Sequence, residues 1–218
     1  MKKFLALFMA LVVFTSFAFF AVGSSDDEGT SGNSDVNSGE VVETPKKLTR
    51  GTITGNVYTN DFAGVSFTKP SDWTFATEEE MKETLNAGAE LTDYSDLELA
   101  LAETATIYDM SAKDSIGNSV LVLCENTMLS AFKKVTEDEY LDLLKSGLQT
   151  INGISYTYNG VNNVTLGNTT FKRATFTAVA SGVTLNQYYY VKSFDKYVFS
   201  IIVTTTTEDV ETIEAMFN

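Results

Sequence analysis

The segment from Ile154 to Thr204 constrains the fold most, because its apolar residues recur at every second position. Residues spaced in this way share one face of a β-strand, so the pattern predicts strands and excludes helices there. Turn dipeptides interrupt it at Asn159-Gly160, Gly167-Asn168 and Ser181-Gly182. Strands are therefore predicted over 154–158, 161–166, 171–180, 183–192 and 197–204. Consecutive strands joined by short turns predict an antiparallel meander.

Capping boxes predict where helices begin, because a Ser or Thr followed three residues later by Glu satisfies the first free backbone N–H groups. The pattern occurs at Thr77/Glu80, Ser95/Glu98 and Thr136/Glu139. The helix after Thr136 carries an apolar stripe typical of a helix packed on a core, formed by Leu141, Leu144 and Leu148.

The remaining pattern adds two short strands over 57–59 and 64–69, a hairpin of 106–112 with 119–125, and a closing helix. The apolar residues of that helix are Val210, Ile213 and Phe217. We therefore predict one α+β domain over 55–218, an α/β/α sandwich whose central antiparallel sheet is covered by helices.

Composition excludes several classes of function. The chain has 29 Asp and Glu against 15 Lys and Arg, a net charge of −14, which argues against nucleic acid or an anionic membrane surface as partner. It has no histidine, which excludes Ser-His and Cys-His nucleophile pairs and most zinc sites. We expect no cofactor. The one cysteine, Cys124, lies in an apolar strand and is interpreted as a small buried hydrophobe.

The N-terminus is typical of an exported protein. A Lys2-Lys3 pair precedes the apolar run from Phe4 to Val22, and residues 1–23 are interpreted as a signal peptide or an uncleaved membrane anchor. The junction resembles a lipoprotein box, but Ser24 stands where the acylated cysteine would be, so lipid anchoring by that route is excluded. Residues 24–54 are rich in Ser, Gly and acidic residues and are interpreted as a flexible linker.

Two stretches of the folded region resemble a known family. Tyr58-Thr59-Asn60, Gly64-Val65-Ser66-Phe67 and Pro70-Ser71-Asp72-Trp73 resemble the beginning of PsbP/Mog1-like α/β/α sandwich domains, especially exported, uncharacterised members from Gram-positive gut bacteria (Firmicutes). The Tyr-rich stretch from Gly182 to Ser200 is similar to the closing sheet of that family. The resemblance implies an accessory or partner-binding protein, and it implies no catalytic residues.

Acidic residues are the candidates for chemistry. They are concentrated between Asp72 and Asp109, and the plainest interpretation is solvated helix faces. Two of them, Asp93 and Asp96, are candidates for a weak Ca²⁺ site, because carboxylate oxygens suit hard cations. Paired carboxylates also leave a small secreted hydrolase as an alternative.

A second candidate site is aromatic. Along Tyr188-Tyr189-Tyr190 the alternation places Tyr189 in the core and Tyr188 and Tyr190, with Lys192, on the wetter face. The three wetter-face residues are interpreted either as ordinary sheet packing or as a patch for recognition.

The prediction for function is an exported, extracytoplasmic accessory or binding module of the cell envelope, without catalytic activity. Its expected partner is an extracellular or cell-surface protein or ligand, and not nucleic acid. A membrane contact is expected only through residues 4–22, if they are retained. The alternatives are the carboxylate-dependent hydrolase and a membrane-tethered extracytoplasmic sensor.

Overall fold

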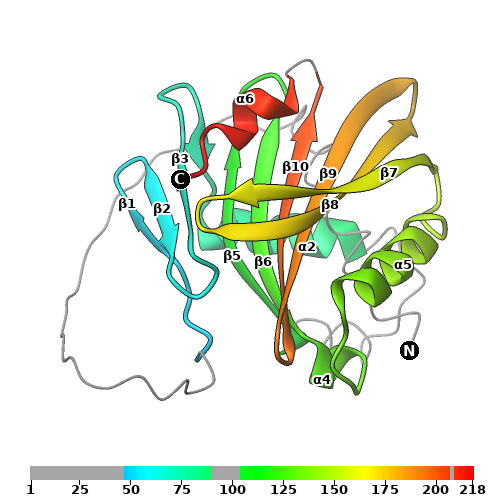
Figure 1. Ribbon diagram of the computed structural model, residues 1–218. Helices are drawn as coiled ribbons and strands as arrows, with labels where there is room; N and C mark the ends of the chain where they lie inside the picture. The colour runs from blue at the N-terminus through cyan, green and yellow to red at the C-terminus, as the bar shows by residue number, and fades with distance from the viewer. Residues whose placement is uncertain (1–46, 90–103, 207–208) are drawn as a thin grey trace.

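A seven-stranded antiparallel sheet forms the centre of the computed structural model, which describes residues 47–89, 104–206 and 209–218 (Figure 1). Its strand order is β4-β5-β6-β10-β9-β8-β7. These strands are β4 (Thr74–Phe75), β5 (Thr106–Lys113), β6 (Ser119–Asn126), β7 (Ile154–Leu166), β8 (Thr169–Ala180), β9 (Val183–Phe194) and β10 (Tyr197–Thr205). The predicted hairpin of β5 with β6 and the meander from β7 to β10 are therefore confirmed.

The central strands of the large sheet, β6 and β10, are buried on both faces, whereas most of β7 is exposed. On one face, Leu121, Val198 and Ile202 pack with residues of helix α5 (Glu137–Leu148). On the other face, Val122, Phe199 and Ile201 pack beneath a second, three-stranded sheet and helix α6 (Val210–Glu214). The second sheet contains β1 (Thr52–Thr54), β2 (Val57–Asn60) and β3 (Val65–Thr68). The mixed α/β class is as predicted, and one of the two covering layers combines strands with a helix.

The capping boxes position the helices as the sequence predicts. Thr136 accepts a hydrogen bond from the Glu139 backbone N–H, and the Glu139 carboxylate accepts one from the Thr136 N–H, so both groups of the box are paired at α5. Thr77 and Glu80 form the same reciprocal pair before α2 (Glu78–Ala89). Ser95 and Glu98 lie outside the described residues.

Two boundaries differ from the prediction. Asn159-Gly160 is not a turn: β7 runs through it as one strand, and the register against β8 shifts there, between Tyr158 and Gly160. Gly160 has φ +121°, and positive φ values are found at a β-bulge as well as in a turn. The Asn-Gly dipeptide alone therefore did not distinguish a turn from a bulge. Residues 52–54, assigned to the linker, form β1 against β2. The sequence did not predict this strand, because three residues are too few to show a period.

The β7–β8 turn docks against the second sheet. The Thr169 hydroxyl donates to the Ala63 carbonyl at 2.5 Å, and the Asn168 N–H donates to the Gly64 carbonyl at 3.1 Å. Gly167 has φ +57°, and a Cβ there would lie 2.5 Å from the Asn218 carbonyl oxygen. The two sheets and the C-terminus therefore meet at a position that only glycine fits.

Replacement of this glycine tests the docking. Gly167→Ala is expected to destabilise the fold more than Gly55→Ala, because both glycines have φ +57° but a Cβ at Gly55 would have no atom within 4 Å. The left-handed backbone costs alanine about 1–2 kcal/mol at either site, and the clash adds roughly 1–3 kcal/mol at Gly167 alone. Urea denaturation of both variants measures the difference, and equal losses would contradict the tight docking.

Candidate binding surface

The predicted aromatic patch is not a surface patch. Tyr190 is 0% exposed and packs among Phe171, Phe199 and Ile213, so its predicted place on the wetter face is wrong. Tyr189 is buried on the opposite face, as predicted. The alternation along β9 was correct, but it could not show that the second sheet and α6 cover the face assigned to solvent.

A hydrogen bond holds Tyr190 in place, and a cation–π contact holds Tyr188. The Tyr190 hydroxyl donates to the Glu214 carboxylate of α6 at 2.5 Å, and the Arg173 guanidinium reaches the same oxygen at 2.5 Å. The guanidinium also lies 5.5 Å from the centre of the half-buried Tyr188 ring. Lys192 is 3.4 Å from the Glu137 carboxylate at the start of α5. These contacts attach α6 and α5 to the sheet, which is a structural role.

The candidate cation ligands Asp93 and Asp96 lie outside the described residues. Within the part of the chain that the structure describes, no three His, Cys, Asp or Glu side chains come together as a metal site would require. Over the same residues, no helix has the length and apolar content needed to span a bilayer. Cys124 is buried, as predicted, and burial raises the pKa of its thiol to about 12.

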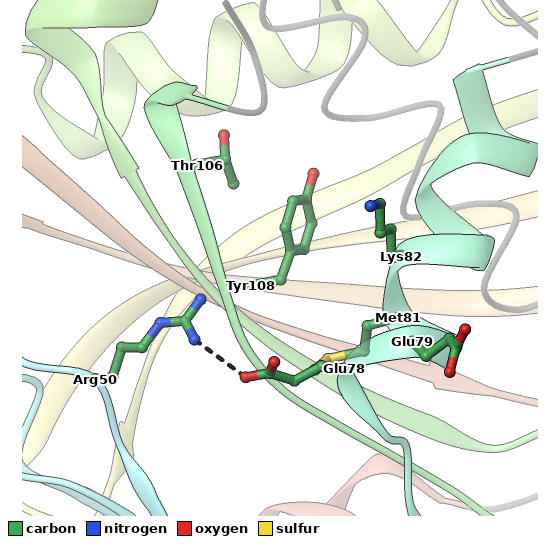
Figure 2. Close-up of a pocket in the computed structure, with 7 residues that line it drawn as sticks. All are labelled: Arg50, Glu78, Glu79, Met81, Lys82, Thr106 and Tyr108. Atoms are coloured by element: carbon green, nitrogen blue, oxygen red, sulfur yellow. Dashed lines mark ion pairs between the residues drawn. The ribbon is translucent and has the colours of Figure 1, made fainter. Parts of the chain in front are cut away.

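A pocket of about 490 Å³ lies between α2 and the edge of β5. Arg50, Glu78, Lys82 and Tyr108 are among the residues that line it (Figure 2). Arg50 lies 3.5 Å from the Glu78 carboxylate. A carboxylate hydrolase needs two acids that converge on the cleft, but the Glu79 carboxylate points away from that of Glu78. This pocket therefore does not carry the hydrolase hypothesis.

The most exposed group of large apolar side chains in close sequence belongs to the segment after β6. Met128 and Leu129, on the short helix α4 (Thr127–Ser130), are 43% and 45% exposed, and the following Phe132 is 66% exposed. Figure 1 places α4 at one end of the molecule, beside the β9–β10 turn. We name these three residues the apolar tip. No site was predicted here from the sequence, although the apolar residues of 128–132 followed by Lys133-Lys134 were a visible signal.

Hydrogen bonds attach the segment that carries the tip to the sheet. The Asn126 side chain caps α4 by accepting from the Met128 N–H at 3.2 Å. The Thr127 N–H and hydroxyl both donate to the Lys196 carbonyl in the β9–β10 turn, at 2.9 and 3.1 Å. Because the segment is fixed at its base, its apolar side chains are held outward instead of collapsing onto the core.

The backbone of Phe132 has φ +57°, in the left-handed region. A bulky side chain rarely adopts that region, which costs on the order of 1–3 kcal/mol. The ring is 66% exposed and so buries little apolar surface to offset that cost. Strain without burial points to a role for the side chain outside the fold.

Lysines surround the tip. Lys133 donates to Glu139 at 2.6 Å, and Lys134 pairs with Asp195. Hydrogen bonding from Lys133 lowers the pKa of Glu139 to about 2, and hydrogen bonding from Lys134 lowers the pKa of Asp195. All four side chains are largely exposed, so these pairs contribute little to stability and exchange readily with other partners.

A buried carboxyl group lies at the base of the tip. Glu125 precedes the Asn126 cap, is buried, and accepts a hydrogen bond from the Tyr140 hydroxyl of α5 at 3.0 Å. Burial raises the pKa of Glu125, and its hydrogen bonds to Ser130 and Tyr140 offset only part of that shift. Glu125 therefore connects α4 to α5 through a carboxyl whose neutral form the interior favours.

Comparisons with known proteins concern the fold. No family model matches this sequence, and no curated protein matches it. The structure is similar to cyanobacterial PsbP (CyanoP) from Synechocystis sp. PCC 6803, at 10% identity and a TM-score of 0.42, over 80% of this chain and 99% of that one. It is also similar to LpqN, involved in cell envelope biogenesis of Mycobacterium tuberculosis, at 10% identity and a TM-score of 0.38, over 70% and 76%. PsbP, which the sequence resembles, is thus among the structures similar to this one.

The buried carboxyl makes stability depend on pH. Since the folded pKa of Glu125 lies above its unfolded value, its contribution to stability is present at low pH and is lost as pH rises through the folded pKa. Glu125→Gln cannot ionise and keeps a partner for Tyr140. Its free energy of unfolding, relative to the unmodified chain, should therefore increase from about pH 5 to about pH 8. Urea titrations across that range measure this difference, and a constant difference would show that Glu125 titrates normally.

Proposed function

We propose that this protein is an exported, extracytoplasmic binding module that docks on a component of the cell envelope through its apolar tip, without catalytic chemistry of its own. Export is supported by the Lys pair and apolar run at residues 1–23. Docking is supported chiefly by one observation: Phe132 is both strained and 66% exposed.

The surrounding geometry fits docking better than catalysis. Three large apolar side chains on a fixed segment give a compact anchor, and polar contacts at its margin provide orientation. The lysines beside the tip and their exposed acidic partners supply such a margin. Isolated exposed apolar residues need no explanation. A group of them that is held by hydrogen bonds and includes a residue with a strained backbone does need one.

Binding of the purified full chain is measured on isolated envelopes of the cell that produces it. Phe132→Asp is expected to weaken this binding about tenfold, because one large apolar contact contributes roughly 1.5 kcal/mol. The matched control is Ile116→Asp, at a residue that is 53% exposed in the β5–β6 turn. The control should bind like the unmodified chain. Equal binding by all three proteins would contradict docking through the tip.

Phe132→Gly separates function from stability. Glycine tolerates φ +57° at no steric cost, so this variant should be about 1 kcal/mol more stable than the unmodified chain, after the entropy cost of glycine is deducted. It should also bind envelopes more weakly, because the ring is gone. Thermal denaturation and the envelope assay give the two values. A variant that loses stability would show that the ring serves the fold.

A further inference from the structure

We propose that the apolar tip docks on an anionic lipid bilayer, with Met128, Leu129 and Phe132 entering the interfacial region; this inference rests on the proposed function and names its partner. The three residues belong to α4 and the segment after it, and α4 lies at one end of the molecule beside the β9–β10 turn (Figure 1). Their side chains are 43%, 45% and 66% exposed, so they can meet a flat surface without any groove in a partner. Phe, Leu and Met are apolar enough to leave water for the headgroup–acyl boundary.

Local charge agrees with this orientation, although total charge does not. The chain carries −14 in all, but each acid of the first turn of α5 faces a lysine: Glu137 faces Lys192, Asp138 faces Lys172 and Glu139 faces Lys133. Asp195 is similarly matched by Lys134, and Lys196 lies in the same turn as Asp195. Over the described residues, the tip end is therefore close to neutral or slightly basic, while the other described residues include more acids than bases.

That distribution fixes which end meets an anionic surface. The acidic residues elsewhere in the described domain are repelled by the bilayer and the tip end is not, so the field of the bilayer turns the tip toward it. Once the tip is close, Lys133 and Lys134 can exchange their exposed carboxylate partners for lipid phosphates while their stems lie along the apolar boundary. The net charge of −14, which predicted no contact with anionic membranes, is a sum over the whole chain and does not show this local distribution.

The expected contact is weak and reversible. Three half-exposed apolar side chains give only a few contacts with the bilayer, and stable attachment needs a second signal. The apolar run from Phe4 to Val22 would supply that signal where it is retained. The tip would then hold the domain against the membrane surface instead of at the end of its linker.

Phe132→Trp tests the contact at the tip itself, whatever the N-terminal run does. The chain has one tryptophan, Trp73, which is buried and supplies a constant background in the unmodified chain. The full-length variant is incorporated into vesicles of phosphatidylglycerol and phosphatidylethanolamine, and into vesicles of phosphatidylcholine alone. We expect the tip tryptophan to shift to shorter wavelength and to be quenched by brominated acyl chains in the anionic vesicles. High salt and the double variant Lys133→Gln/Lys134→Gln should reduce both effects.

Ile116→Trp, at a similarly exposed position in the β5–β6 turn, is the control and should remain unshifted. An unshifted tryptophan at position 132, or an equal shift at position 116, would overturn the bilayer contact. If Phe132→Asp still loses envelope binding in that case, the proposed function stands with a protein or glycan as its partner. If Phe132→Asp also binds envelopes normally, both the proposed function and the bilayer contact are rejected.

Discussion

Burial of the central strands β6 and β10 on both faces is the constraint on which the rest of the structure depends. In β10, every residue after Tyr197 is buried, with Val198 and Ile202 facing α5 and Phe199 and Ile201 facing the second sheet. The faces of the central strands β6 and β10 cannot serve recognition, because each face is already core. A partner must therefore bind elsewhere, at the outer strands, the turns or the ends of the strands.

Polar groups inside these layers orient the covering elements. Glu214 accepts hydrogen bonds from Tyr190 and Arg173 and so holds α6 on the sheet. Asp109 of β5 accepts from the Gly51 N–H, the Tyr58 hydroxyl and the Asn60 amide at 2.5–2.8 Å, which ties the second sheet to the first. Glu214 and Asp109 are half-buried, and a carboxylate shielded from water is costly unless it is hydrogen-bonded, so each favours one arrangement of its neighbours. Glu125 does the same for α4 and α5, and through them for the apolar tip.

The strands, the two described capping boxes and the closing helix follow from local pattern, because hydrogen bonding within four residues and alternation along a strand are local effects. The bulge at Asn159-Gly160 and the strand at Thr52–Thr54 could not be predicted, because each depends on the partner strand. The aromatic patch failed for a related reason: alternation showed that Tyr188 and Tyr190 share a face, but not what covers it. Asp109 and Glu125 had a signal, as acids within apolar strands, but their partners lie far away in sequence.

The amino-acid sequence by itself determined the mixed α/β class, the antiparallel meander and the total charge, because these are properties of composition and of neighbouring residues. Only the tertiary structure decided which face of β9 is buried, and that Met128, Leu129 and Phe132 lie together outside the core. It also decided that lysines from β8, β9 and the turns meet the acids at the start of α5. The physical reason is that burial and charge pairing depend on distances between residues remote in the chain, which the order of residues does not contain.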